Sequence, residues 1–324
     1  MKCIFNPLTE PYFNLAVEEY LLDNVEDDVF MLWRNEPSII VGKFQNSLAE
    51  INVDYVKENG IKVVRRQTGG GAVFHDLGNL NFTFVESNSN GNFRTFTEPI
   101  LEVLRQMGVD ARFEGRNDLT INGMKISGNA QCVHHRRMLH HGTLLFSSEM
   151  TDLSKALNVN PLKFQDKAVK SVRKRVTNIS EYLEDKSLSV LDFADRIMRY
   201  ILASRQDAEM YAFTEEELQY IRRLTDEKYG TWEWNFGSSP KYTFHKSAKT
   251  SAGIVELYLT LDKSLIQEAK IYGDFFARKD ISELEQKLIN LPHNEQALNT
   301  LLSKVVVADY ISGIEEEEFK ALFF

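Results

Sequence analysis

The segment that most constrains how this chain can fold is residues 63–84, VVRRQTGGGAVFHDLGNLNFTF. It places two arginines, a triple glycine and a histidine between an apolar run that ends at Val64 and a stretch in which Leu80, Phe82 and Phe84 alternate with polar residues. Period-two alternation is typical of a half-buried strand. We therefore expect two strands joined by a glycine-rich loop, and that loop is the first candidate for function.

The triple glycine predicts an anion-binding loop. Glycine tolerates positive φ and close approach of a ligand, so backbone N–H groups in such a run can converge on a phosphate or carboxylate. The pattern GxxxxGK[ST] is absent and a strand, not a helix, is expected to follow, which excludes a P-loop and a dinucleotide fingerprint. Taken alone, three glycines are more often a structural turn, but the cations Arg65, Arg66 and Lys125 favour phosphate binding.

A second candidate is the basic segment at residues 163–176, KFQDKAVKSVRKRV. It has no helical apolar face, and it concentrates positive charge in a chain whose formal net charge is -9. The acidic total argues against a general nucleic-acid binder, which normally has a basic excess. The segment predicts a long loop that becomes ordered around an anion.

Lys125 follows the strongest hairpin signal in the chain. Residues 118–121 and 124–126 flank Asn122-Gly123, a pair that suits a type I′ turn because both central residues need positive φ. A lysine on a strand is usually solvated. One fixed beside a tight turn and followed by Ser127-Gly128 can instead point into a site.

The length of 324 residues predicts a large domain at residues 1–245 and a smaller one at 246–324. The composition shift at residues 237–240, GSSP, supports this boundary. Strands are expected at residues 29–33, 38–41, 61–64, 254–261 and 267–271, with a strand-like aromatic element at residues 232–236. Helices are expected at residues 14–23, 47–59, 97–107, 153–157, 188–204 and 214–228.

Other reactive side chains give weaker signals. Cys3 and Cys132 have neither disulfide-framework nor zinc spacing, although Cys132 stays open as a thioester nucleophile. Four of the seven histidines lie within residues 134–141, but neighbouring strand residues face opposite sides, so polar contacts are favoured over a metal site. His75-Asp76 lacks a partner nucleophile, so His75 is interpreted as a ligand contact or support.

Five motifs together resemble lipoate-protein ligases of the A type. They are RRQTGGGAVFHDLGNLNFTF, RNDLTINGMKISGNA, HHGTLLF, KSVRKRVTNIS and WEWNFG, in family order and spacing over about the first 240 residues. The remainder resembles the accessory domain of two-domain members. The resemblance implies an α+β fold with mixed sheets flanked by helices, similar to biotin protein ligases, followed by a small α+β domain.

The resemblance also implies a two-step reaction. ATP and (R)-lipoate give lipoyl-adenylate and pyrophosphate, and the ε-amine of a lysine on a lipoyl domain then attacks the acyl carbon and releases AMP. Acceptors of this family are the acyltransferase components of 2-oxoacid dehydrogenases and the glycine cleavage H protein. Mg²⁺ is expected with ATP, near Asp118, with no metal held by a protein cluster.

The site residues that the resemblance implies fall into three groups. Lys125 is the expected catalytic residue, touching both the lipoyl carbonyl and the α-phosphate. The ATP or adenylate contacts are Arg66, Gly70, Gly71, Ala72, Val73, Phe74, Asn117, Asp118, Lys125, Lys170, Ser171, Val172 and Arg173. The lipoate contacts are Trp33, Arg65, His75, Gly128, His141 and Gly142, with Trp33, Phe44 and Phe74 as candidate walls for the dithiolane tail.

Two alternatives stay open. One is an ATP-independent octanoyl or lipoyl transferase that uses a cysteine thioester, and the other is a non-catalytic lipoate or adenylate binder. ATP-dependent pyrophosphate release separates both from the ligase. The start of the chain lacks a secretory signal and no apolar run suits a bilayer, so we expect a cytoplasmic monomer with no membrane or nucleic-acid partner.

Overall fold

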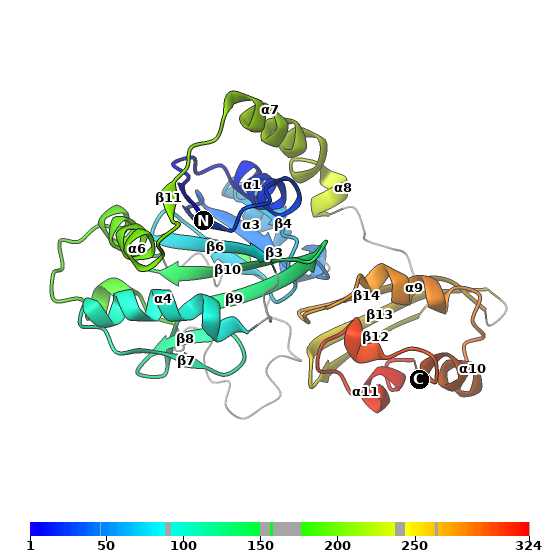
Figure 1. Cartoon of the computed structure of the whole chain (residues 1–324). Helices are drawn as coiled ribbons and strands as arrows, with labels where there is room; N and C mark the ends of the chain where they lie inside the picture. Colours follow the sequence, from blue (N-terminus) through cyan, green and yellow to red (C-terminus); the bar gives the residue numbers. More distant parts are fainter. Residues whose placement is uncertain are drawn as a thin grey trace.

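The computed structural model describes residues 1–323 except 46, 88–91, 150–155, 158–175, 237–243 and 263–264. Its centre is an eight-stranded mixed sheet with the strand order β11-β1-β2-β6-β10-β9-β8-β7 (Figure 1). These strands are β1 (Lys2–Phe5), β2 (Val29–Trp33), β6 (Asn79–Ser87), β7 (Ala111–Glu114), β8 (Asp118–Ile121), β9 (Met124–His134), β10 (Arg137–Leu145) and β11 (Glu209–Met210).

Both faces of this sheet are covered, which explains why all five residues of β2 are buried. Phe30 and Leu32 pack on one side with α4 and α6, whereas Val29, Met31 and Trp33 pack on the other with α1. Successive strand residues point to opposite faces, so a strand buried on both sides is apolar throughout. The helices are α1 (Pro11–Asn24), α4 (Phe93–Gln106) and α6 (Val190–Ser204).

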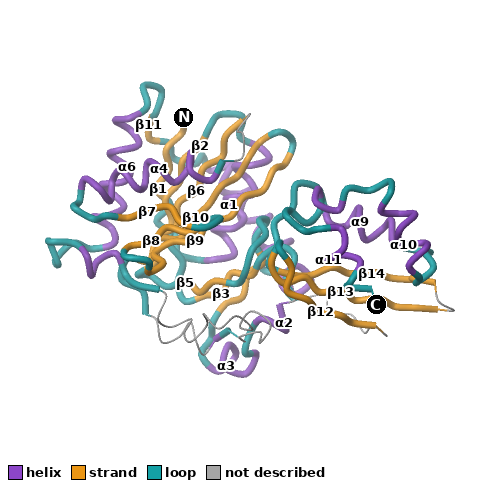
Figure 2. The backbone as a smooth tube through the Cα atoms, turned by 90° about the horizontal axis from the view of Figure 1, so that it is seen from below, coloured by secondary structure: helices purple, strands orange, loops and turns teal. Residues whose placement is uncertain are grey.

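A second sheet lies on the α1 side and carries the glycine loop. Its order is β4-β3-β5, with β3 parallel to β4 and antiparallel to β5, and the glycines connect β4 to β5. Figure 2 shows β3 and β5 below the large sheet, close to α2 and α3. The elements are β3 (Ser38–Val41), β4 (Lys62–Arg65), β5 (Val73–His75), α2 (Ser47–Glu50) and α3 (Val53–Glu58).

The helix expected over residues 47–59 is wrong as a single element. Ile51 leaves the helical path to form an antiparallel bridge with Leu157, and this separates α2 from α3. The Asn52 side-chain oxygen then accepts a hydrogen bond from the Tyr55 N–H at 3.2 Å, which caps the new helix. The helix expected at residues 153–157 lies almost entirely outside the described residues, which here include only 156 and 157.

The hairpin prediction is confirmed. Asn122 and Gly123 have φ angles of 52° and 74°, the left-handed conformation that a type I′ turn requires. β8 and β9 pair antiparallel on either side of the turn. Lys125 is thus the second residue of a strand held at the edge of a rigid turn.

The aromatic element at residues 232–236 is a helix, not the strand that its alternation suggested. α8 (Trp232–Asn235) is capped by Thr231, whose hydroxyl accepts a hydrogen bond from the Trp234 N–H. The Trp234 indole N–H donates to the Arg65 carbonyl at 2.9 Å, so the aromatic helix packs against the strand that leads into the glycine loop. It follows α7 (Glu215–Leu224) and the single turn η4 (Thr225–Tyr229).

The C-terminal part is an antiparallel three-stranded sheet, β12-β13-β14, with helices packed on it. The predicted boundary between residues 245 and 246 falls inside β12, and the domain division stays a prediction. The elements are β12 (Phe244–Thr250), β13 (Gly253–Asp262), β14 (Leu265–Gly273), α9 (Ile281–Leu288), α10 (Glu295–Leu302) and α11 (Glu316–Lys320), with the short turn η5 (Val307–Asp309). A further short turn, η3 (Ile179–Tyr182), precedes α6 in the first part of the chain. Together the sheets and helices confirm the predicted α+β fold class.

The C-terminal part contacts the glycine loop directly. The Gly70 N–H donates to the Phe275 carbonyl at 3.2 Å, and the Gly273 N–H donates to the Phe44 carbonyl at 2.5 Å. The rings of Phe44 and Phe275 stack with centroids 4.8 Å apart. Phe44, a candidate wall for an apolar ligand tail, therefore lies at this contact between the two parts. No helix in the described ranges is both long and apolar enough to cross a bilayer.

Candidate active site

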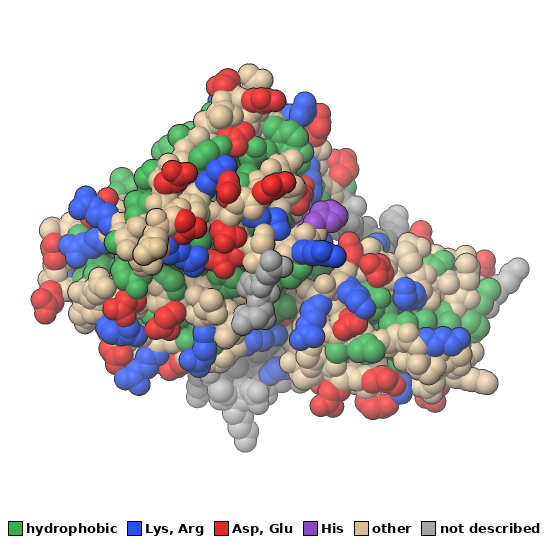
Figure 3. Space-filling model, in the orientation of Figure 1, with side chains coloured by type: hydrophobic (Ala, Val, Ile, Leu, Met, Phe, Trp, Pro, Cys, Tyr) green, Lys and Arg blue, Asp and Glu red, His purple; other side chains and the backbone are tan. Residues whose placement is uncertain are grey.

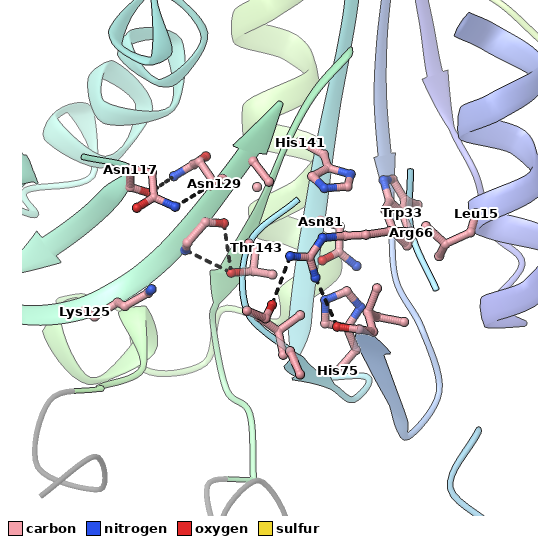
Figure 4. Close-up of a pocket in the computed structure, with 18 residues that line it drawn as sticks. Leu15, Trp33, Arg66, His75, Asn81, Asn117, Lys125, Asn129, His141 and Thr143 are labelled. Carbon is pink, nitrogen blue, oxygen red and sulfur yellow. Dashed lines mark hydrogen bonds between the residues drawn. The ribbon is translucent and has the colours of Figure 1, made fainter. Parts of the chain in front are cut away.

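A cavity of about 170 Å³ opens between the two sheets (Figure 4). One wall comes from β2, β6, β9 and β10 of the large sheet, and the other from β3, β5 and the glycine loop. It is lined by Leu15, Trp33, Ile40, Arg66, Gly70, Gly71, Ala72, Val73, His75, Asn81, Asn117, Lys125, Gly128, Asn129, Ala130, His141, Gly142 and Thr143.

Arg66 holds the glycine loop in shape from within. Its guanidinium is buried and donates to the carbonyls of Gly69, Gly71 and Ile40 and to the Thr68 hydroxyl, at distances of 2.6–3.2 Å. Burial lowers the pKa of Arg66 to about 10, which leaves it charged at neutral pH. The loop is thus closed around a cation, and Gly70 takes the positive φ of 92° that favours glycine.

Close backbone contact at Gly42 gives a first prediction. A Cβ at this position would lie 2.0 Å from the Gly70 carbonyl oxygen, so Gly42→Ala must displace the glycine loop. We expect it to lower the free energy of unfolding by about 3 kcal/mol or more, the upper range for overpacking. Denaturant unfolding measures the change. Gly60→Ala is the comparison, since its left-handed φ is strained but its Cβ would meet nothing, and its expected cost is about 1 kcal/mol. Equal losses in the two variants would contradict the contact.

Lys125 lies at the rim of the cavity, next to Gly128. A Cβ built on Gly128 would come within 3.0 Å of the Lys125 Nζ, so the absence of a side chain there makes room for the ammonium. Nζ forms an ion pair with Asp118 Oδ1 at 2.7 Å, and both side chains are about one third exposed. The ammonium is therefore partly solvated and faces the glycine loop across the cavity (Figure 4).

The end of the basic segment is attached at the same place. Val176, its last residue, forms a parallel bridge with Lys125, and the Thr177 N–H donates to the Lys125 carbonyl at 3.0 Å. Lys170, Ser171, Val172 and Arg173 lie outside the described residues. The chain thus returns from the basic segment directly onto the strand that carries Lys125.

His141 joins the cavity to a buried carboxylate. Its Nδ1 lies 2.9 and 3.0 Å from the two carboxylate oxygens of Glu18, and its Nε2 lies 2.8 Å from the Thr68 hydroxyl. Glu18 Oε1 also accepts from the Thr83 hydroxyl at 2.6 Å, which in turn accepts from the Trp33 indole N–H at 2.8 Å. This network fixes the orientations of Trp33 and His141, two of the expected lipoate contacts.

His75 is buried at the inner end of the cavity, where its ring edge packs on Trp33 with centroids 6.0 Å apart. Burial, with smaller effects of the nearby Arg66 and His141 side chains, lowers the pKa of His75 to about 3. The imidazole is therefore neutral at physiological pH and unsuited to accept a proton as a general base.

The structure brings most of the expected site residues together. Of those named from the sequence, the cavity is lined by Trp33, Arg66, Gly70, Gly71, Ala72, Val73, His75, Asn117, Lys125, Gly128, His141 and Gly142. Asp118 is beside it through its ion pair with Lys125. Phe74 points instead into the core between the second sheet and α3.

Arg65 also lies outside the cavity. Its guanidinium donates to the carbonyls of Gly42, Lys43, Gln45 and Trp234 and to the Ser47 hydroxyl. These partners tie β4 to the chain after β3 and to α8. Arg65 therefore supports the loop rather than facing the space that a ligand would occupy.

Sequence reasoning missed six lining residues, which are Leu15, Ile40, Asn81, Asn129, Ala130 and Thr143. Asn81 could have been recognised from the sequence. An asparagine buried within the apolar strand NLNFTF needs a hydrogen-bond partner, which indicates a polar site beside that strand. Leu15, Ile40 and Ala130 are ordinary apolar residues of a helix and two strands. Nothing in their local sequence separates them from core residues.

Cys132 is not placed for nucleophilic chemistry. It does not line the cavity, and burial raises the pKa of its thiol to about 12, so almost none is thiolate at neutral pH. It lines a separate cavity of about 210 Å³ between the two parts of the chain, with Lys43, His134, Arg278 and Lys279 around it. Figure 3 shows basic side chains and a histidine gathered where the two parts meet.

Metal-ligating side chains do not cluster in the part of the chain that the structure describes. No group of three or more His, Cys, Asp or Glu side chains there could hold an ion. Asp118 alone offers a carboxylate beside Lys125, which suits Mg²⁺ bound chiefly through substrate phosphates and water.

Comparison with known proteins matches both parts of the chain to described families. Residues 10–202 match the lipoyl protein ligase A/B catalytic domain, and residues 239–323 match the bacterial lipoate protein ligase C-terminus. Lipoate–protein ligase 1 of Staphylococcus aureus is 42% identical over 97% of this chain and 96% of its own length. Lipoate-protein ligase LplJ of Bacillus subtilis is 41% identical over 98% of each chain.

Solved structures agree with these matches. P. falciparum LipL1 in complex with lipoate has a TM-score of 0.79 at 26% identity, covering 98% of this chain and 96% of that one. A lipoate-protein ligase A bound with ATP has a TM-score of 0.62 at 30% identity, covering 73% and 99%. A bi-partite ligase of Thermoplasma acidophilum, described with its E2 lipoyl domain, has a TM-score of 0.64 at 33% identity, covering 75% and 98%. The family prediction is confirmed: this chain belongs to the lipoate-protein ligase family, with its catalytic domain followed by its C-terminal domain.

Proposed function

We propose that this protein is an ATP-dependent lipoate–protein ligase that forms lipoyl-AMP and transfers the lipoyl group to a lysine of a lipoyl domain. The observation that carries the proposal is the position of Lys125, an ammonium at the rim of a cavity whose opposite wall is the arginine-braced glycine loop. The similarity to a ligase bound with ATP and to one in complex with lipoate supports both substrates.

In the first step, attack of the lipoate carboxylate on the α-phosphorus increases negative charge on the phosphoryl oxygens. A cation fixed beside those oxygens stabilises that charge more than the ground state. Lys125 is held by β9 and by the returning chain at Val176, so it needs little reorganisation. The backbone of residues 70–74 and Asn117 would position the nucleotide.

In the second step, the acceptor amine attacks the acyl carbon and AMP leaves. The same ammonium can polarise the acyl carbonyl and stabilise the developing oxyanion. The incoming amine must lose its proton, and the neutral, buried His75 does not suit that role. The remaining acceptors for that proton are the phosphate oxygens of the adenylate and water.

The lipoate chain would lie toward the apolar part of the cavity. Trp33, Leu15 and Ile40 line that part, and a dithiolane tail needs an apolar surrounding. The polar carboxyl end would then lie toward Lys125 and Gly128. His141 and Gly142 flank the path between them, as expected for lipoate contacts.

Mg²⁺ accompanying ATP would neutralise phosphate charge, held by the phosphates and by Asp118. Two cations would then act on the phosphates, the ammonium of Lys125 and a Mg²⁺ ion held by Asp118. The Lys170–Arg173 contacts stay a prediction, supported by the attachment of Val176, three residues after Arg173, beside Lys125.

The decisive test is incubation with ATP, Mg²⁺, lipoate and a panel of purified lipoyl domains. The expected results are lipoate-dependent pyrophosphate release and a lipoyl mass gain on at least one acceptor. The similarity to a ligase described with its E2 lipoyl domain supports that class of acceptor. Absence of pyrophosphate release with full mass gain from an acyl-carrier donor would favour the transferase instead. Lipoate binding without either reaction would favour the non-catalytic binder.

Cys132→Ser separates the ligase from a thioester transferase. Because the thiol lies outside the cavity, we expect the variant to keep pyrophosphate release and acceptor lipoylation within about twofold of wild type, the range of ordinary substitutions. Cys3→Ser is the control at the other cysteine, which is buried, whereas Cys132 is partly exposed. Loss of lipoyl transfer in Cys132→Ser but not in Cys3→Ser would support the cysteine-thioester transferase instead. The cytoplasmic location and the monomeric state stay predictions.

A further inference from the structure

Three buried asparagines connect the start of the chain to His75. Asn6 Nδ2 lies 2.7 Å from Asn14 Oδ1, Asn14 Nδ2 lies 2.8 Å from Asn35 Oδ1, and Asn35 Nδ2 lies 3.1 Å from His75 Nδ1. Each of these side chains is at most 6% exposed. The chain of hydrogen bonds runs from the loop before α1 to the inner end of the cavity.

Backbone groups fix the direction of this chain. The Leu8 N–H can only donate, so the Asn6 atom that it meets at 3.2 Å is oxygen. The carbonyls of Leu8 and Arg34 can only accept, so the Asn14 atom that lies 3.0 and 2.9 Å from them is nitrogen. The amide orientations are thereby determined by the main chain rather than assigned by choice.

The same logic determines the tautomer of His75. Asn14 donates to the Asn35 oxygen, so the Asn35 nitrogen faces the ring and donates to Nδ1. A neutral imidazole with an accepting Nδ1 carries its proton on Nε2. Burial, the Arg66 charge and His141 keep the pKa of this imidazole far below neutrality, so Nε2–H is a permanent donor.

That donor has no partner among the described residues. His75 Nε2 is a buried atom without a hydrogen bond, on a side chain that lines the cavity and is 3% exposed. The Asn81 Nδ2 is unpartnered in the same way, and Asn81 also lines the cavity. Asn81 is the register partner of Trp33, against which His75 packs, so these polar groups share one end of the cavity.

We propose that the Nε2–H of His75 is a specificity-determining donor for a sulfur atom of the dithiolane ring, through which the site prefers lipoate to an unsubstituted eight-carbon fatty acid. This inference rests on the proposed function and adds to it the means of selecting the acid. The substrate class is an acyl chain that carries a weak, uncharged acceptor at its far end.

The strand register indicates that the His75 donor lies near the end of lipoate that is remote from its carboxyl group. Trp33 pairs with Asn81, Asn81 pairs with Thr143, and the Thr143 hydroxyl accepts from the Gly128 N–H next to Lys125. Trp33 is thus three strand spacings from Gly128, about 14 Å, and His75 packs on Trp33 at that end of the row. An extended eight-carbon acid whose carboxyl is at Lys125 reaches this distance with its ring, not with its carboxyl.

The chemistry of the donor suits sulfur. A fixed, uncharged N–H in apolar surroundings gains from any acceptor, and a divalent sulfur of the dithiolane disulfide is a weak acceptor. A plain alkyl chain leaves the donor buried and unsatisfied, which is unfavourable. Octanoate therefore loses affinity at this position even though its chain fits the same apolar space.

The first experiment measures lipoate and octanoate affinity by calorimetry without nucleotide, in wild type, His75→Leu and His75→Gln. Leucine removes the donor, and glutamine places an N–H near the position of Nε2. The ratio of lipoate to octanoate affinity is expected to fall about tenfold in His75→Leu and to stay within about threefold in His75→Gln. Asn24→Asp, at the exposed end of α1, is the control variant. A parallel fall for both acids, or an unchanged ratio in His75→Leu, overturns the proposal.

A second measurement needs no variant. Long-range ¹H–¹⁵N spectra of the wild-type protein are expected to show His75 as the Nε2–H tautomer, with its N–H resonance shifting on addition of lipoate and not of octanoate. An Nδ1–H tautomer, or equal shifts with both acids, overturns the proposal. Selective lipoate binding in a protein that releases no pyrophosphate with ATP would contradict the proposed function and leave this inference intact.

Discussion

Lys125→Ala is expected to reduce ATP- and lipoate-dependent pyrophosphate release by at least about a hundredfold, as for loss of one preorganised charge donor in other enzymes. The ammonium is the group that would stabilise charge on the phosphoryl oxygens. Its side chain is more than one third exposed, and its ion pair among the described residues is with Asp118 at 2.7 Å, so the fold should not depend on it. The melting temperature is therefore expected to stay close to that of wild type.

The control for this variant is Lys320→Ala, which removes a lysine of α11 in the C-terminal part that is 23% exposed and ion-paired with Glu316 and Glu317. Lys125→Arg is an informative companion, because a longer, planar cation keeps the charge but not the position. We expect it to recover only part of the lost rate. Adenylate yield close to wild type in Lys125→Ala would refute the role assigned to the ammonium.

Arg66→Met is expected to have the largest effect on stability. The variant removes a cation whose hydrogen bonds reach three carbonyls and a hydroxyl, and these groups lose that donor. The free energy of unfolding should fall by about 3–5 kcal/mol, since each hydrogen bond to a charged group contributes about 1.5–3 kcal/mol and the contributions are not additive. Denaturant titration measures this loss.

Function should fall with it, because the glycine loop would lose the shape that Arg66 imposes. ATP-dependent pyrophosphate release is measured at low temperature, where the variant is still folded. Arg222→Met is the matched control, as that arginine is largely exposed on α7. A variant with wild-type stability and impaired adenylation would show that Arg66 contacts the nucleotide instead of bracing the loop.

The local pattern of the sequence predicted much of the fold. Val29, Met31 and Trp33 could be assigned to a strand, and Asn122-Gly123 to a turn, because their signals are short-range and backbone-based. The failures had tertiary causes. Ile51 breaks the expected helix to pair with Leu157, which is distant in sequence, and Trp234 becomes helical because its indole docks on Arg65.

The site was predictable where the chemistry is concentrated in motifs. The glycine loop, Lys125 and His141 carry charge or unusual backbone freedom, and the resemblance to a known family placed them in one pocket. Leu15 and Ile40 were missed because a cavity wall and a core contact use the same side chains. Arg65 was assigned to the ligand from its charge and from the family resemblance, and only the partners of its guanidinium separate it from Arg66.

The Gly70 N–H of the glycine loop donates a hydrogen bond to the Phe275 carbonyl, so the C-terminal part occupies a donor that a bound phosphate could also use. A backbone N–H can serve one strong acceptor at a time, so a phosphate that accepts from Gly70 displaces the C-terminal part from that contact. By thermodynamic linkage, a variant that weakens this contact without changing the loop is expected to raise the affinity for such a ligand, by at most the factor by which the contact is weakened. If a phosphate binds there, the Phe275 carbonyl would act as an intramolecular competitor for the Gly70 N–H, and its effect would depend on how firmly the rest of the chain holds Phe275 beside the loop.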